Sequence, residues 1–189
     1  MIEKIVNKIT SEIVRQGVVS EENIPVFRYG LLSMIEISII VLTMLLISVS
    51  LGRIFEAGAL IGTIIVFRSL EGGYHARTFK SCYLISVIVF ILTLLAVDLM
   101  SQKLFPAAVI TCSIISILIL VYLRTGPTRS REAENVNRHR FYKAAILAHL
   151  LYYSFIITMF ISGTTNIILL TCSFGYAISQ VTVFIEYRR

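Results

Sequence analysis

Long apolar runs separated by short polar segments dominate the chain. Six runs carry at most one charged residue each, and five of them have about the twenty residues that an α-helix needs to cross a bilayer. They cover residues 31–50, 54–67, 82–100, 104–123, 144–162 and 165–186. The pattern predicts an all-α, polytopic membrane protein with six transmembrane helices.

The run 54–67 is shorter than the others. Its residues would form a helix of about 21 Å, which is less than the roughly 30 Å thickness of the hydrocarbon core. This helix must extend into its flanks, thin the bilayer locally, or dip into the membrane without crossing it.

The N-terminal residues follow a different pattern. Residues 1–16 place isoleucine and valine at helical spacing with charged residues between them, which predicts an amphipathic helix lying along the membrane surface. Residues 17–30, which include Gly17 and Pro25, are predicted to be a linker.

The distribution of positive charge predicts the topology. In a six-span arrangement, 15 of the 17 Lys and Arg residues fall in the N-terminal segment, the loops 68–81 and 124–143, and the C-terminus, whereas Arg53 and Lys103 lie on the other side. Because cytoplasmic loops are enriched in Lys and Arg, both termini and both loops are predicted to be cytoplasmic.

The composition excludes a soluble domain. Apolar residues make up 57% of the chain and the mean hydropathy is +0.85, so residues 1–189 are interpreted as one integral membrane domain. Topology accounts for the net charge of +6, and we expect no nucleic-acid partner. Cys112 and Cys172 lie within apolar runs and are interpreted as small hydrophobic residues.

The polar island 68–82 holds the candidate chemistry. His75 and Cys82 are seven residues apart, which on one straight helix would separate them by about 10 Å along the axis. A base needs to lie about 3 Å from the proton that it takes, so the pair requires a bend. Gly72 and Gly73 permit a bend because glycine accepts backbone angles that other residues avoid.

After such a bend, Thr78 or Ser81 could cap a new helix. Cys82 would then lie in the first turn of that helix, close to Arg77 and Lys80, where the helix dipole and the cations favour the thiolate. A thiolate beside a histidine is the arrangement of a cysteine nucleophile with its base. A lone Cys and His without a local signature can also be unrelated residues.

Other ionisable residues have competing interpretations. His75, Cys82 and His139 could be metal ligands, but the paired short spacing of zinc sites is lacking, so we expect no metal and no cofactor. His149, in an apolar run, is predicted to bond a neighbouring helix, although an intramembrane ionisable group is also a functional candidate. Glu36 could orient His75 as a third group.

The basic loop 124–143 has two interpretations that do not exclude each other. Its cations could bind anionic lipid headgroups, or they could dock an acidic segment of a partner. The candidate docking residues are Arg129, Arg131, Arg138, Arg140 and Lys143.

The island resembles a known family. Arg68 and the motif Gly73-Tyr-His75-x6-Cys82 are similar to those of the accessory gene regulator B (AgrB) family of Gram-positive quorum-sensing systems. The resemblance extends to Tyr29-Gly30 at the first span and to a basic loop containing Pro127 after the fourth. It covers essentially the whole chain.

The resemblance implies a cysteine endopeptidase of the bacterial cell membrane. It makes Cys82 the nucleophile and His75 its base, with Arg68 and Gly73 as further positions needed for activity and Gly72 as a supporting neighbour. It supplies no third catalytic residue. The basic loop resembles the family's functional basic segment but has no run of consecutive lysines.

The expected reaction forms an acyl-thioester on Cys82. An AgrD-like precursor would lose its C-terminal part, and an internal Cys or Ser of the bound peptide would then attack the thioester and close a thiolactone or lactone ring. Such a precursor is expected to have an amphipathic leader, which confines it to the membrane, and an acidic tail that suits the basic loop.

The alternative function is that of a non-enzymatic membrane transporter or structural subunit. Such a protein would tolerate Cys82→Ser and His75→Ala, whereas the peptidase would keep its fold and lose turnover. Export of the peptide by the same chain is a third hypothesis, for which no nucleotide-binding motif is present. Six short helices offer a limited interior and are compatible with a homodimer.

Overall fold

The computed structural model describes residues 2–17, 23–72, 76, 78–101, 105–123, 138–162 and 167–188. This part of the chain contains helices and no strands, which confirms the all-α prediction. The helices are α1 (Ile2–Arg15), α2 (Ile24–Ser50), α3 (Ile54–Glu71), α4 (Phe79–Ser101), α5 (Phe105–Leu123), α7 (Arg138–Ile161) and α8 (Ile167–Arg188).

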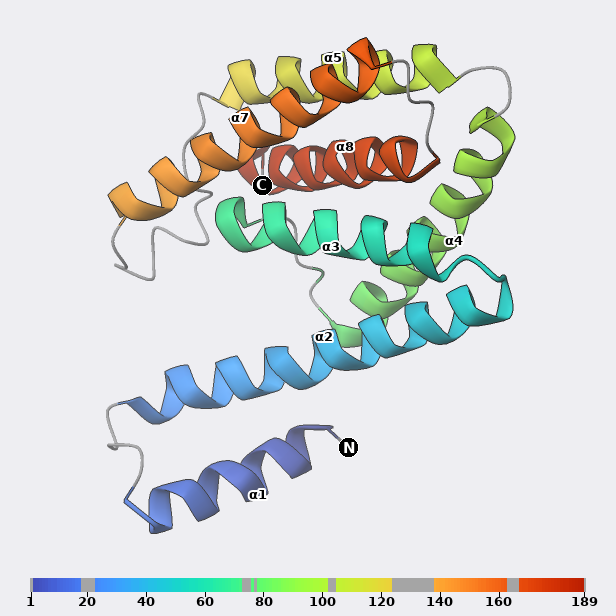
Figure 1. The fold of residues 1–189 in the computed structure, drawn as a ribbon. Helices are drawn as coiled ribbons and strands as arrows, with labels where there is room; N and C mark the ends of the chain where they lie inside the picture. Colours follow the sequence, from blue (N-terminus) through green and yellow to red (C-terminus); the bar gives the residue numbers. More distant parts are fainter. Residues whose placement is uncertain are drawn as a thin grey trace.

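The helices from α3 onward form a bundle around α8. Figure 1 shows α8 between α3 and α5, and it packs against both, while α7 packs against α3, and α4 crosses the bundle steeply. The ends of α3, α5 and α8 and the starts of α2 and α7 lie on the same side in this view. These helix ends flank the segments that are predicted to lie on one side of the membrane.

Helix α8 is the most enclosed element. Its buried residues are Leu169, Leu170, Thr171, Ser173, Gly175, Tyr176, Ser179, Gln180 and Val183. Several are small, and small residues let helix backbones approach closely where no hydrophobic effect drives association. A Cβ at Gly175 would lie 3.2 Å from both the Leu60 carbonyl oxygen and the Thr63 Cβ of α3. The glycine thus permits the contact between α3 and α8.

We expect Gly175→Leu to destabilise the protein. Its side chain would push α3 away from α8, and overpacking of this kind typically costs about 1–3 kcal/mol. The midpoint of thermal unfolding in detergent should fall clearly below that of the wild type. Gly62→Leu is the matched control, because no atom lies within 4 Å of a Cβ at Gly62; equal midpoints for the two variants would contradict the role of Gly175.

An apolar cluster joins α2, α3 and α4. It is built on Leu60 and Ile61 of α3 and on Phe90 and Leu94 of α4, with partly buried residues of α2 against them. Beyond one end of this cluster an ion pair links the start of α3 to the last turns of α4.

In that ion pair the Arg53 guanidinium lies 2.5 Å from the Asp98 carboxylate and 3.8 Å from Glu56.

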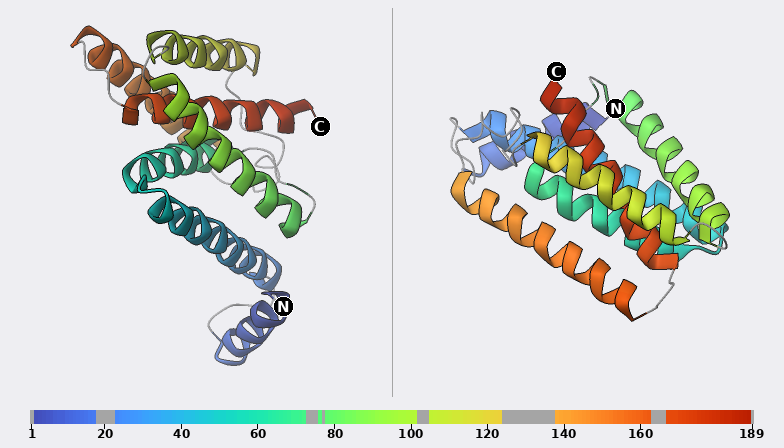
Figure 2. Two further views of the ribbon diagram at one scale, coloured as in Figure 1. Left: turned by 90° about the vertical axis from the view of Figure 1, so that its right-hand side faces the viewer. Right: turned by 90° about the horizontal axis from the view of Figure 1, so that it is seen from above.

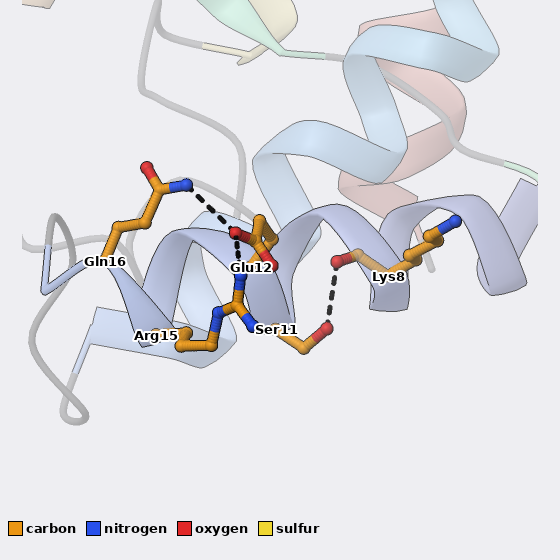
Figure 3. A network of polar contacts seen from close by, with 5 residues as sticks. All are labelled: Lys8, Ser11, Glu12, Arg15 and Gln16. Atoms are coloured by element: carbon orange, nitrogen blue, oxygen red, sulfur yellow. Dashed lines mark hydrogen bonds and ion pairs between the residues drawn. The ribbon is translucent and has the colours of Figure 1, made fainter.

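Helix α1 packs against α2, apart from the bundle (Figure 2). Val6 and Thr10 are buried, and the Arg28 side chain of α2 donates a hydrogen bond of 2.8 Å to Asn7. On its polar side, Glu12 accepts hydrogen bonds from Arg15 and Gln16, and Ser11 donates to the carbonyl of Lys8 (Figure 3). The location of α1 along a membrane surface stays a prediction.

Three helices are long and apolar enough to cross a membrane: α2, α4 and α8. Shorter apolar stretches lie in α5 and α7, again counting only the residues that the structure describes. The chain is therefore a membrane protein, and the count of six spans stays a prediction. Helix α3, with 18 residues, is about 27 Å long, so the run 54–67 does extend into its polar flank.

The helices begin and end beyond the apolar runs. The prediction of a linker over 17–30 is wrong in its second half, because α2 begins at Ile24 with Pro25 in its first turn, a position where proline needs no hydrogen-bond donor. The loop 68–81 is shorter than predicted because α3 ends at Glu71 and α4 starts at Phe79. Likewise, α7 starts at Arg138, inside the predicted basic loop. The predicted apolar runs end at charged residues, whereas the observed helices continue through these residues.

Candidate active site

The polar island is held between the last turn of α3 and the first turn of α4. Helix α3 ends at Gly72, whose φ of 81° is a left-handed conformation that favours glycine. The Gly72 N–H donates to the Arg68 carbonyl at 2.9 Å and closes the last turn. The predicted break in the helix therefore occurs at Gly72, while Gly73 lies outside the described residues.

Thr78 caps α4, as one of the two predicted alternatives. Its hydroxyl oxygen accepts a hydrogen bond of 3.3 Å from the Ser81 N–H, and its own hydroxyl donates to the Ser81 hydroxyl at 3.0 Å. The Cys82 N–H donates to the Thr78 carbonyl at 3.0 Å. Cys82 thus lies in the first turn of α4, as predicted from its position after the glycines.

Contacts beyond the cap fix the direction of this first turn. The Tyr83 hydroxyl, one residue after Cys82, donates a hydrogen bond of 3.4 Å to Thr43 of α2. The Tyr83 ring also lies 6.0 Å from the ring of Phe79, between centroids. Cys82 itself is half-buried and forms no disulfide.

Arg68 of α3 lies close enough to Cys82 for their charges to interact. Partial burial lowers the pKa of the Arg68 guanidinium from its ordinary value, and the negative charge of Cys82 acts in the opposite direction because opposite charges stabilise each other. Arg68 and Cys82, two predicted site residues on different helices, therefore lie within the range of a charge interaction.

A buried polar network adjoins the site on its α3 side. The Glu71 carboxylate contacts His149 Nε2 of α7 and accepts a hydrogen bond of 2.7 Å from Gln180 of α8. His149 Nδ1 lies 2.8 Å from the Tyr176 hydroxyl, also on α8. His149 therefore bonds neighbouring helices, which confirms its predicted role.

Aromatic rings enclose this network. Phe67 stacks on His149 with 5.3 Å between ring centroids and lies 4.5 Å from the Tyr176 ring, while Tyr152 lies 4.1 Å from Tyr176. His149 and Gln180 are only 4% and 1% exposed. Polar groups buried to this extent need hydrogen-bond partners, so the network is a fixed part of the interior.

Sequence reasoning missed Glu71. The residue lies directly before the glycine pair, within the polar island, and the sequence analysis assigns it no role. A carboxylate one residue before a helix-ending glycine, combined with a histidine inside an apolar run, was the signal that could have paired Glu71 with His149.

Several predicted residues remain untested. His75 and Arg77 lie outside the described residues, and so do Arg129 and Arg131. The backbones of Arg138 and Arg140 belong to the first turn of α7. Lys143 lies in the second turn and is exposed. Glu36 lies on α2, and its carboxylate interacts electrostatically with the carboxylate of Glu3 on α1. Its role as a third group stays a prediction.

Cys112 of α5 is buried and Cys172 of α8 is half-buried, and both are free thiols. Cys172 packs against an apolar cluster around α8, which includes Leu169, Leu170 and Tyr176 of this helix. Among the residues that the structure describes, no three His, Cys, Asp or Glu side chains lie close enough together to hold a metal ion. The described part of the site therefore consists of the Cys82 thiol, the Arg68 cation and the start of α4.

Comparison with known proteins gave one match. The family described as accessory gene regulator B matches residues 2–184, nearly the whole chain. No curated protein and no solved structure matches.

Proposed function

Since this chain belongs to the accessory gene regulator B family, whose members take part in processing quorum-sensing peptides, we propose that it is a membrane cysteine endopeptidase. Its substrate would be an AgrD-like precursor peptide. Its nucleophile would be Cys82, its base His75, and its product a peptide acyl group held on Cys82 as a thioester.

The main support for the proposal is the position of Cys82 in the structure. The thiol lies in the first turn of a capped helix, near the cation of Arg68. The partial positive charge of the helix start and the guanidinium both stabilise a thiolate, and the thiolate is the nucleophilic form of cysteine.

The chemistry needs one proton to move twice. His75 takes the proton of the Cys82 thiol, and the sulfur attacks a peptide carbonyl carbon of the precursor. The carbon–nitrogen bond then breaks, His75 gives the proton to the leaving amine, and the N-terminal part of the precursor remains bound to sulfur.

The start of α4 also offers donors for the oxyanion that forms during the attack. The Cys82 N–H is bonded to the Thr78 carbonyl, and the Ser81 N–H is bonded to the Thr78 hydroxyl. The first N–H groups of a helix have no intrahelical acceptor, so Phe79 and Lys80 supply the N–H groups that we assign to the oxyanion.

Cyclisation follows from the stored thioester. An internal thiol or hydroxyl of the bound peptide gives its proton to His75 and attacks the acyl carbon, which releases the Cys82 thiolate and closes a thiolactone or lactone. Exclusion of water favours this attack over hydrolysis. The amphipathic leader of the precursor would lie on the inner leaflet, and its acidic tail would bind the basic loop 124–143, both at the cytoplasmic side.

Intact-mass spectrometry on protein in liposomes with its precursor peptide tests the proposal. We expect an adduct whose mass equals the precursor minus its C-terminal fragment and which hydroxylamine removes, because thioesters react with hydroxylamine. His75→Ala should reduce the yield of this adduct. If the precursor binds the membrane but neither adduct nor cleavage appears, the non-enzymatic transporter or structural function is favoured instead.

A further inference from the structure

Glu71 joins the end of α3 to two other helices. Its carboxylate contacts His149 of α7 and accepts a hydrogen bond from Gln180 of α8, and only 11% of the Glu71 side chain is exposed. Removal of one partner would leave a buried polar group without its hydrogen bond, which is strongly unfavourable. The position of the last turn of α3 is therefore strongly fixed at this residue.

The same turn carries Arg68. Glu71 lies three residues after Arg68, and the next residue, Gly72, donates its N–H to the Arg68 carbonyl. Residues three apart in a helix lie on neighbouring positions of its surface. A rotation or fraying of the turn at Glu71 would therefore move the Arg68 side chain relative to Cys82 of α4.

We propose that Glu71 is a positioning residue for the Cys82 site, and that it acts by holding Arg68 beside the thiol. The proposal rests on the function proposed above and adds a residue to it. His149 and Gln180 serve as the anchors of Glu71. Glu71 itself takes no part in the proton transfer, because its two carboxylate oxygens already bond these anchors.

Whether the removal of Glu71 raises or lowers the reactivity of Cys82 distinguishes a positioning role from a direct effect of the Glu71 charge. A negative charge on Glu71 acting directly on Cys82 would disfavour the thiolate. If the charge acted directly, its removal would make Cys82 more reactive. If Glu71 holds Arg68 in place, its removal makes Cys82 less reactive.

The test is a double-mutant cycle on the alkylation rate of Cys82 by iodoacetamide at pH 7, with peptide mapping to identify the alkylated cysteine. We expect Arg68→Gln to slow alkylation about three- to tenfold, because the variant lacks the cation that stabilises the reactive thiolate. Glu71→Ala should slow it by a similar factor. The double variant should be no slower than either single variant, since coupled residues do not add.

Two further variants complete the design. Glu71→Gln should react at nearly the wild-type rate, because its amide can pair with both anchors, and Ser69→Ala on the same turn is the matched control. Should Glu71→Ala fail to fold, Gln180→Leu removes an anchor from the other side and should slow alkylation only while Arg68 is present.

Multiplied effects in the double variant would overturn the proposal, and so would faster alkylation of Glu71→Ala or slow alkylation of Glu71→Gln. The measurement needs no precursor peptide. The two proposals therefore fail in different experiments. Absence of the peptide adduct would contradict the peptidase proposal, and the alkylation rates of the double-mutant cycle would contradict the positioning proposal.

Discussion

Replacement of Cys82 by alanine is expected to abolish precursor cleavage and the acyl adduct, with a loss of at least about 1,000-fold. Without the sulfur atom no thioester forms, and neither His75 nor Arg68 can replace it as a nucleophile. The variant should still fold, because Cys82 is half-buried at the end of the bundle and its N–H bond to Thr78 belongs to the backbone. Cleavage measured on membranes with equal amounts of protein provides the comparison.

Cys172→Ala is the matched control for this prediction. Cys172 is also a half-buried free thiol on a membrane helix, but it packs against the apolar cluster around α8. We expect its loss to lower thermal stability and to leave the acyl adduct in place. Cleavage by Cys82→Ala at the wild-type rate would exclude the cysteine mechanism, and loss of the adduct only in Cys172→Ala would place the nucleophile on α8.

Arg68→Gln is expected to have the second-largest effect, a loss of about tenfold or more in the rate of adduct formation. Its guanidinium interacts with the charge of Cys82, and a nearby cation favours the nucleophilic thiolate. Arg68→Lys should recover part of the rate, because it restores the charge without the planar fork of donors. Single-turnover kinetics with saturating precursor would isolate this step from substrate binding.

Arg15→Gln is the control for the loss of one cation. Arg15 is exposed on α1 and pairs with Glu12, so its substitution should leave the rate of adduct formation unchanged. An equal decrease in Arg15→Gln and Arg68→Gln would indicate a general effect of net charge, such as weaker attraction of an acidic precursor, and would contradict a local role for Arg68.

The sequence predicted the features that depend on local pattern. Hydrophobic runs indicated the membrane helices, the glycine pair indicated the break after α3, and Thr78 was one of the two residues expected to cap α4. The structure bears out the break at Gly72 and the cap at Thr78. Each of these features depends on residues that are close in the chain.

Features that join distant segments could not be predicted in the same way. Glu71 and Gln180 are 109 residues apart, and neither has a neighbour in the sequence that indicates the other. Helix boundaries were also misplaced where charged residues continue a helix, as at Arg68 and Arg138. Hydropathy measures the preference of a segment for lipid, whereas a helix ends where its backbone conformation changes.

The central place of α8 has a consequence for biogenesis. Helices α3 and α5 leave the ribosome before α8, yet both pack against it, and Glu71 finds its Gln180 partner only there. During synthesis, the inner faces of the early helices must therefore remain in lipid or against the insertion machinery. The bundle can assemble only after α8 has entered the membrane, so the proposed peptide processing would have to wait for this helix.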